Sequence, residues 1–200
     1  RPRGWLPTLK VSNARQGFFE RPTLEAILAF VPVVLRGCIR AAYLTGWRLR
    51  SELLTREWRH VDLDAGWLRL EPGEGKTGEG RMFPLTPELR EVLDAQRAYT
   101  DQVQRELGRI VPWVFHRRGK PIVSVQRSWE RARARAGFPG ALIHDFRRTA
   151  VRNQERAGIP RSAAMRMVGH KTESMYRRYA IVDEALLQES AVKLAALQER

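Results

Sequence analysis

Seven side chains in this sequence have the chemical character and the spacing to act together on a phosphate group. Three short segments, TGWRLRSELL, HDFRR and GHKTESMYRRY, carry six of them, and a glycine-rich stretch between the first two segments carries the seventh. In chain order they are Arg48, Arg50, Lys76, His144, Arg147, His170 and Tyr179. The histidine and arginine of HDFRR are three residues apart, a spacing that places both side chains on one face of a helix.

These residue types match what cleavage of a phosphodiester requires when no metal takes part. Two guanidinium groups can bind the charge that develops on the non-bridging oxygens, and they stay protonated at any working pH. A tyrosine hydroxyl can attack phosphorus, although its pKa of about 10 means that it needs help to lose its proton. A lysine or histidine can protonate the departing sugar oxygen. The sequence holds no acidic cluster suited to magnesium, so we expect neither a metal nor a cofactor.

Each segment alone is a weak signal. An arginine after a helix, a His-x-x-Arg pair on a basic helix and a Gly-His pair followed by a tyrosine are all common as solvated or packing residues. A lysine on a hairpin tip is ordinarily a surface charge. The evidence for a shared phosphate chemistry is that all of them occur in this order and at this spacing, over about 130 residues of a strongly basic chain.

The charge of the chain indicates the class of partner. The 200 residues carry a formal net charge of +14, and the sequence pI is about 11.1. Such a field suits a polyanion, with nucleic acid ahead of an acidic membrane surface or a ribosomal role. No apolar run is long enough to span a membrane, and the only cysteine, Cys38, excludes an intrachain disulfide. We therefore expect a cytoplasmic protein that binds a polyanion.

The elements that must position these residues follow from the periodicity of the apolar residues. Helical spacing predicts helices over about 24–31, 35–45, 51–58, 86–93, 125–136, 143–157, 160–168 and 174–179. Thr23 and Thr86 are placed to cap the first and fourth of these, and Gly46 to end the second. Two strand-like runs, 67–70 and 81–85, predict a β-hairpin with Lys76 near its tip. The predicted fold class is mostly α with a small antiparallel β-sheet (α+β).

The three segments resemble the signature boxes of the tyrosine recombinases, also called the phage integrase family. That family has a box similar to TGxRxSEL, a β-hairpin lysine, an HxxR box, and a GH box followed nine residues later by tyrosine. The resemblance covers roughly residues 20–182. It implies a mostly α fold with a small antiparallel sheet. It also implies site-specific DNA recombination through a 3′-phosphotyrosyl intermediate, carried out by a homotetramer on double-stranded DNA without ATP or metal.

The resemblance also implies a role for each matched residue. Arg48 and Arg147 would clamp the phosphate, and Lys76 would protonate the leaving 5′-oxygen. His144 and His170 would assist proton transfer and hold the phosphate. Tyr179 would be the nucleophile. Three further residues inside the boxes would support these: Glu52, which would brace the first arginine, and Asp145 and Arg148.

Two positions leave alternatives open. The first box has one residue more than the family pattern, so alignment from Gly46 selects Arg48 and alignment from Ser51 leaves Arg50 as the nearest arginine; we favour Arg48. Tyr176 lies three residues before Tyr179, and the nine-residue spacing favours Tyr179.

The resemblance divides the chain into three parts. Residues 1–20 would be a linker or the edge of an absent N-terminal DNA-binding domain, 21–182 the catalytic domain, and 183–200 a C-terminal helix that protomers could exchange. Two other functions remain open. They are DNA relaxation like that of type IB topoisomerases, which generally have lysine where this chain has His144, and a DNA-binding module without catalysis. The sequence does not specify the DNA target, although the first box is closest to integrases of mobile elements.

Overall fold

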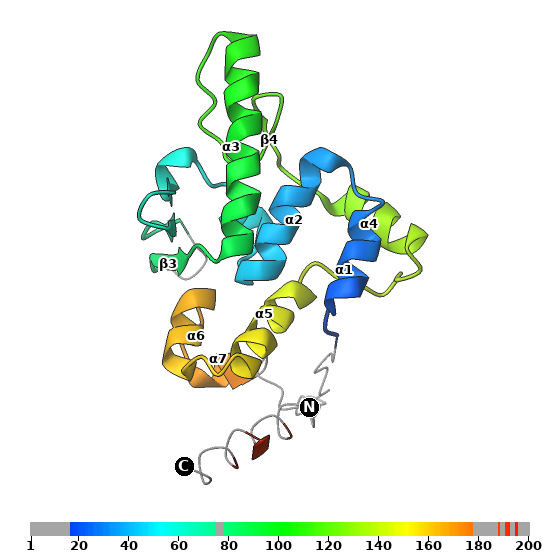
Figure 1. The fold of residues 1–200 in the computed structure, drawn as a ribbon, viewed down its shortest axis with the longest axis vertical. Coiled ribbons are helices and arrows are strands. Elements are labelled where there is room, and N and C mark those ends of the chain that lie inside the picture. Colours follow the sequence, from blue (N-terminus) through cyan, green and yellow to red (C-terminus); the bar gives the residue numbers. More distant parts are fainter. Residues whose placement is uncertain (1–16, 75–77, 178–187, 189–190, 193–194, 196–200) are drawn as a thin grey trace, which may run out of the picture.

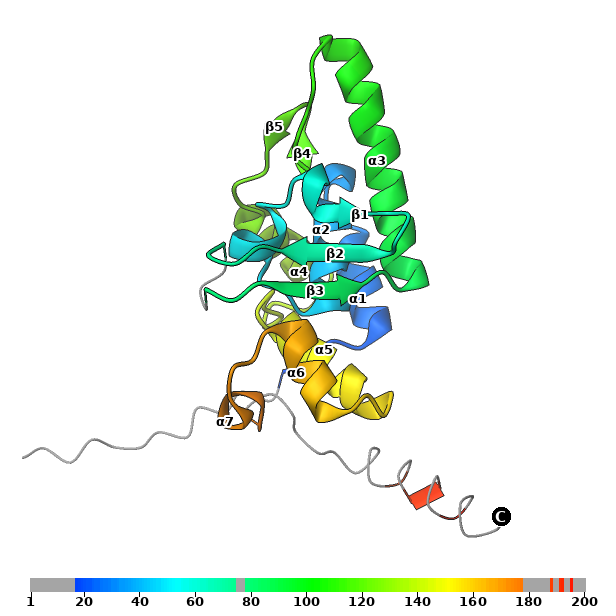
Figure 2. The same ribbon diagram turned by 90° about the vertical axis from the view of Figure 1, so that its left-hand side faces the viewer.

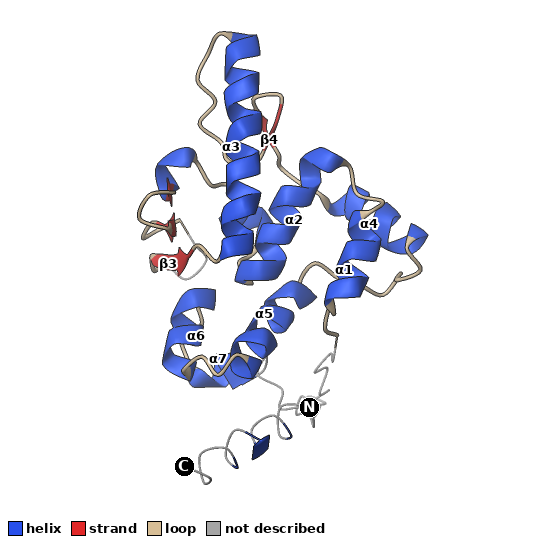
Figure 3. Cartoon of the chain, viewed as in Figure 1, coloured by secondary structure: helices blue, strands red, loops and turns tan. Residues whose placement is uncertain are grey.

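The computed structural model describes residues 17–74, 78–177, 188, 191–192 and 195. Helices make up most of this part of the chain, and the strands form two small antiparallel sheets (Figures 1 and 3). In chain order the elements are α1 (Arg21–Leu28), α2 (Val33–Thr45), η1 (Leu49–Leu53), η2 (Trp58–His60), β1 (Val61–Asp62), β2 (Trp67–Leu70), β3 (Arg81–Pro84), α3 (Pro87–Leu107), β4 (His116–Arg117), β5 (Lys120–Pro121), α4 (Gln126–Arg135), α5 (Asp145–Arg156), α6 (Arg161–Val168) and α7 (Glu173–Arg177).

The first helix begins earlier than its apolar spacing predicts. Glu20, and not Thr23, occupies the N-cap position, and Pro22 lies in the first turn. Proline is well suited to that turn because its missing N–H has no partner there and its φ is already helical. The helix also ends at Leu28, before the predicted end at residue 31. The second helix ends as predicted, at Gly46, whose φ of 67° is left-handed.

The helix predicted over 51–58 does not form. A single π-helical turn, η1, takes its place, and the Arg48 carbonyl accepts hydrogen bonds from the backbone N of both Glu52 (2.9 Å) and Leu53 (3.2 Å). The Glu52 carboxylate bonds back to the Arg48 backbone N at 2.7 Å. This side-chain bond stabilises the N-terminal end of the turn. After the turn, the buried side chain of Arg56 forms an ion pair with Glu74 of the hairpin at 2.7 Å.

The predicted hairpin is present and belongs to a three-stranded antiparallel sheet of order β1-β2-β3. Strands β2 and β3 pair from Trp67 opposite Pro84 to Leu70 opposite Arg81. The sequence did not predict β1, because two residues are too few for a period-two pattern. A turn at Arg118 and Gly119 closes a second sheet, formed by β4 and β5 alone.

The helix capped by Thr86 is longer than its apolar face predicts. The Thr86 hydroxyl accepts from the Leu89 backbone N at 3.4 Å, Pro87 follows, and the helix runs for 21 residues to Gly108. Its far end projects beyond the other helices (Figure 1). None of the described helices is both long and apolar enough to cross a membrane.

The hydrophobic core is centred on α2, which packs against α3 on one side and α5 on the other. Aromatic rings of Phe19, Trp129 and Phe146 contact one another within it, at centroid distances of 4.6 to 5.9 Å. A smaller cluster of buried residues joins α5, α6 and α7. The close packing of α2 on α5 is what brings the first and second sequence segments together.

Candidate active site

Arg147, in the first turn of α5, connects all three sequence segments. Its side chain is buried, and its Nη1 donates to the Gly46 carbonyl at 2.9 Å. Its Nη2 donates to the Gly169 carbonyl at 3.3 Å and its Nε to Nε2 of His170 at 3.1 Å. Both carbonyls belong to left-handed glycines that end helices α2 and α6. The ends of three helices are therefore held around one guanidinium group.

Close packing at Gly46 makes this arrangement possible. A Cβ on Gly46 would lie 2.7 Å from the Cβ of Ala150 in α5, nearer than two carbons can pack. The left-handed φ of this glycine also disfavours any other residue. The glycine of the first segment is therefore required by the approach of α2 to α5, in addition to its role in ending the helix.

Arg48 follows this glycine and is held by Glu52. Its Nη1 donates to Oε1 of Glu52 at 2.6 Å, and its backbone N donates to Oε2 at 2.7 Å. The Glu52 side chain is fully buried, whereas that of Arg48 is 26% exposed. The contact expected between these two residues is therefore present, and the guanidinium group is held in place while still reaching the surface. Arg50, the alternative, is exposed.

A cavity of about 390 Å³ lies beside these arginines. The residues that line it are Trp47, Arg48, Leu49, Arg50, Ser51, Leu54, Ser124, Val125, Gln126, Ile143, His144 and Arg147. Four of the seven residues selected from the sequence are among them. The cavity thus has cationic groups from the first and second segments on its walls and the beginning of α4 on another side.

The two histidines differ in exposure. His144 occupies the position before α5, in helical geometry, and is exposed at the cavity that Arg147 also lines. Partial desolvation and then the charge of Arg147 lower the pKa of His144. His170 is buried, and burial, followed by three nearby arginines, lowers its pKa to about 3. Its Nε2 accepts from Arg147, so the proton of the neutral ring is on Nδ1.

Tyr176, the alternative nucleophile, is fully buried in the cluster that joins α5, α6 and α7. Its ring meets the His170 ring edge to face, with centroids 5.7 Å apart. Burial, and then the nearby carboxylate of Glu155, raise the pKa of its hydroxyl. A raised pKa makes a phenol harder to ionise, so these surroundings suit a packing residue.

Four predicted site residues remain: two lie outside the described residues, and two lie in α5. Lys76 and Tyr179 are outside the described residues. The residues that flank the hairpin tip are both tied to the body of the protein, Glu74 to Arg56 at 2.7 Å and Glu79 to Lys171 at 3.2 Å. The two predicted supporting residues of HDFRR are in the first turns of α5, with Asp145 buried and Arg148 half-buried.

Sequence reasoning missed Arg81, at the start of β3. Its side chain is only 5% exposed, and it donates to Oε2 of Glu52. Its guanidinium carbon lies 4.8 Å from the centroid of the Trp47 ring. One signal could have indicated it: Arg81 is two residues before the buried Phe83, so both face the same side of the sheet.

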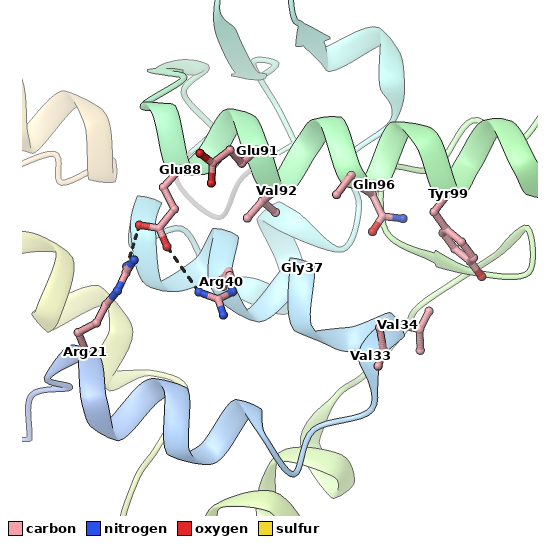
Figure 4. A pocket seen from close by; sticks show the side chains of 11 residues that line it. Arg21, Val33, Val34, Gly37, Arg40, Glu88, Glu91, Val92, Gln96 and Tyr99 are labelled. Carbon is pink, nitrogen blue, oxygen red and sulfur yellow. Dashed lines mark hydrogen bonds and ion pairs between the residues drawn. The ribbon is translucent and has the colours of Figure 1, made fainter.

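A cavity larger than the one beside the arginines lies away from this site. Within the part of the chain that the structure describes, no group of three or more His, Cys, Asp or Glu side chains could hold a metal ion. A larger cavity of about 700 Å³ lies between α2 and α3, mostly apolar, with Glu88 bonded to Arg21 at one end (Figure 4). None of the seven residues selected from the sequence lines it.

Comparison with solved structures gives the same fold. The chain is similar to the XerA recombinase (15% identity, 88% of this chain and 62% of that one, TM-score 0.68). It is also similar to the Tn1549 transposon integrase in complex with transposon right end DNA (17% identity, 94% and 68%, TM-score 0.69). A third match is the catalytic domain of bacteriophage HP1 integrase (24% identity, 88% and 93%, TM-score 0.60). These likenesses confirm the predicted fold class.

The chain spans 62% of the XerA recombinase and about half of the matched lambda integrase chains, at 45% and 56%. No curated protein sequence matches it. The model of the phage integrase family, however, matches residues 19–185, which include every segment that formed the resemblance. The chain therefore belongs to the phage integrase family.

Proposed function

We propose that this chain is the catalytic part of a site-specific DNA recombinase that cleaves and rejoins strands through a 3′-phosphotyrosyl intermediate. The observation that carries the proposal is the junction at Arg147, where one buried guanidinium group bonds to Gly46, Gly169 and His170 beside a cavity that Arg48 also lines. Membership of the phage integrase family supports it.

In this proposal the two arginines bind the scissile phosphate. Arg48 and Arg147 line the same cavity and are both anchored by other bonds, so little side-chain entropy remains to be lost when a phosphate binds. Guanidinium groups bind the non-bridging oxygens through paired hydrogen bonds and stay charged throughout. Their charge stabilises the five-coordinate state more than the ground state, because the oxygens gain charge as that state forms. Asp145 and Arg148 would support the first turn of α5.

The histidines would act mainly through neutral rings. A pKa of about 3 means that His170 is uncharged at physiological pH, so it can donate a hydrogen bond from Nδ1 but does not serve as a cation. His144, exposed at the cavity, is placed to hold the phosphate or to relay a proton. Protonation of the leaving 5′-oxygen is assigned to Lys76, because a lysine ammonium group can donate a proton to a departing oxygen.

Tyr179 is the proposed nucleophile. Tyr176 lies three residues earlier on the same segment, but it is fully buried and its hydroxyl has a raised pKa. Attack on phosphorus requires a hydroxyl that can reach the cavity and lose its proton. Docking of Tyr176 against His170 supports this assignment, because it holds the segment that leads to Tyr179 beside the arginine junction.

The proposed partner is double-stranded DNA, bound by a homotetramer during strand exchange. Matched structures of XerH recombinase, lambda integrase and Tn1549 integrase are complexes with DNA. The net charge of +14 suits a polyanion of this kind. A bacterial or phage-encoded protein of a mobile element, acting on cytoplasmic DNA, is the setting that this proposal implies.

The proposal is tested by trapping the covalent intermediate. The protein is incubated with a pool of nicked duplexes, in which a short fragment carrying the 5′-hydroxyl diffuses away after cleavage, so the adduct survives denaturation. We expect an adduct with the parent protein and with Tyr176→Phe, and none with Tyr179→Phe. An adduct in Tyr179→Phe would show that the nucleophile is wrong. DNA binding without an adduct in any of the three would refute catalysis by this chain.

A further inference from the structure

Arg81, the first residue of β3, is a buried arginine that the chemistry proposed above does not use. Strand β3 packs against α6 (Figure 2), and the guanidinium group of Arg81 lies so close to Gly169 that a Cβ there would overlap it. The same group stacks on the Trp47 ring and donates from Nη2 to Glu52. Arg81 therefore contacts both the first and the third sequence segments from the sheet.

The carboxylate of Glu52 is shared by two arginines. Its Oε1 accepts from Nη1 of Arg48 at 2.6 Å, and its Oε2 accepts from the Arg48 backbone N at 2.7 Å and from Arg81. Glu52 is fully buried and Arg81 nearly so, whereas Arg48 is 26% exposed and lines the cavity. The carboxylate is therefore enclosed between one cation that reaches the cavity and one that does not.

The formal charges of this group show what the second arginine changes. Arg48 and Glu52 alone sum to zero, so a phosphate in the cavity would meet an ion pair with no net charge. With Arg81 included, the group has one net positive charge, which is directed to the cavity through Arg48. Charges a few ångströms apart interact strongly where water is excluded, so a carboxylate without a second cation would cancel the attraction of Arg48 for the phosphate.

Hydrogen bonding alone gives little reason for an arginine at this position. Among the described residues, Nε and Nη1 of Arg81 are buried and make no hydrogen bond, so only Nη2 is matched. Burial of a guanidinium group is costly, and an apolar side chain of similar volume would fill the space between Trp47 and Gly169 more favourably. The positive charge of Arg81 therefore explains an arginine at this position better than its hydrogen bonds or its volume do.

We propose that Arg81 is a positioning residue that neutralises Glu52 and so leaves the full charge of Arg48 available to the scissile phosphate. The inference rests on the proposed function for the identity of that phosphate. In this arrangement the Glu52 carboxylate orients the Arg48 guanidinium group. Arg81 prevents the same carboxylate from cancelling the positive charge of Arg48.

The test is a double-mutant cycle in the full chain. Arg81→Met leaves Glu52 paired with Arg48 alone, so the group has no net charge. The change should slow formation of the covalent adduct by about tenfold or more, since one charge at the transition state is lost. Adding Glu52→Gln removes the carboxylate as well and restores the net charge of the group. We therefore expect the double variant to cleave faster than Arg81→Met, with rates measured at saturating DNA. A double variant as slow as, or slower than, Arg81→Met would overturn the proposal.

Two further measurements separate the charge of Arg81 from an effect of the substitution on folding and from the cleavage step itself. Arg81→Lys keeps the charge but not the stacking geometry, so it should cleave within about threefold of the parent even if it unfolds as readily as Arg81→Met. Affinity for inorganic phosphate, followed by ³¹P line broadening, should fall in Arg81→Met and recover in the double variant. An unchanged phosphate affinity would refute the role of Arg81, whereas the absence of an adduct from the parent protein would refute the proposed function alone.

Discussion

Replacement of Gly46 by alanine should separate the helices that form the site. The added Cβ would lie 2.7 Å from that of Ala150, and the residue has a φ of 67°. The left-handed conformation costs a non-glycine residue about 1–2 kcal/mol, and relief of the overlap costs about 1–3 kcal/mol more. Together they give a loss of about 2–5 kcal/mol in the free energy of unfolding. Because the Gly46 carbonyl accepts from Arg147, the same change displaces the junction.

Gly108→Ala is the matched control for this prediction. Gly108 ends α3 with a φ of 61°, and nothing lies within 4 Å of an added Cβ. It should therefore lose only the conformational part, about 1–2 kcal/mol. The effect of alanine on the unfolded chain is the same in both variants and cancels in the comparison. Urea unfolding gives the stabilities, and adduct formation gives the activity.

Equal stabilities for the two variants would refute the reasoning, because the overlap between α2 and α5 would then carry no energetic weight. Normal cleavage by Gly46→Ala would refute it in a second way, since the Arg147 junction would not depend on this carbonyl. We expect Gly108→Ala to cleave at the rate of the parent protein, because Gly108 does not line the cavity beside the arginines.

Further predictions concern the junction, the histidine, the second tyrosine and the helix cap. Arg147→Met should lower the melting temperature by roughly 10 °C, because a buried charged donor with three partners is lost, whereas Arg48→Met, 26% exposed, should change it by roughly 3 °C or less. Both should abolish adduct formation, and an unaltered melting temperature in Arg147→Met would contradict the geometry. Stability should fall as the pH drops below 6.5, because the folded pKa of His170 is about 3 and protons then bind preferentially to the unfolded chain. The slope, about 1 kcal/mol per pH unit by urea unfolding, should flatten in His170→Asn; an identical slope would argue against a buried neutral ring. Tyr176→Leu should reduce cleavage with DNA binding intact, because the contact with His170 is lost, and Tyr176→Phe should not; equal rates would count against a docking role. Thr86→Ala should cost about 1 kcal/mol and leave cleavage unchanged, since only the cap of α3 is lost; unchanged thermal unfolding would show that the cap contributes nothing.

The local elements of the site could be predicted because their signals are local. Gly46 and Gly169 end helices α2 and α6, Thr86 caps α3, and the hairpin strands occur where alternation and glycine placed them. A cap or a tight turn depends on a few neighbouring residues and their allowed φ values, which a sequence states directly. The helix predicted over 51–58 is wrong. The η1 turn is held by a bond from the Arg48 backbone N to the Glu52 carboxylate, and such a bond leaves no periodic pattern in the sequence.

The sequence by itself determined the family, the fold class and the residue types available for phosphate chemistry. Only the tertiary structure decided which of these residues meet. It placed Arg48 on Glu52 and left Arg50 exposed, enclosed Tyr176 beside His170, and brought Arg81 from the sheet to the same carboxylate. Arg147 and Gly46 are 101 positions apart. Contacts over such separations are set by how α2, α5, α6 and β3 pack, and neither propensity nor spacing within a segment encodes that packing.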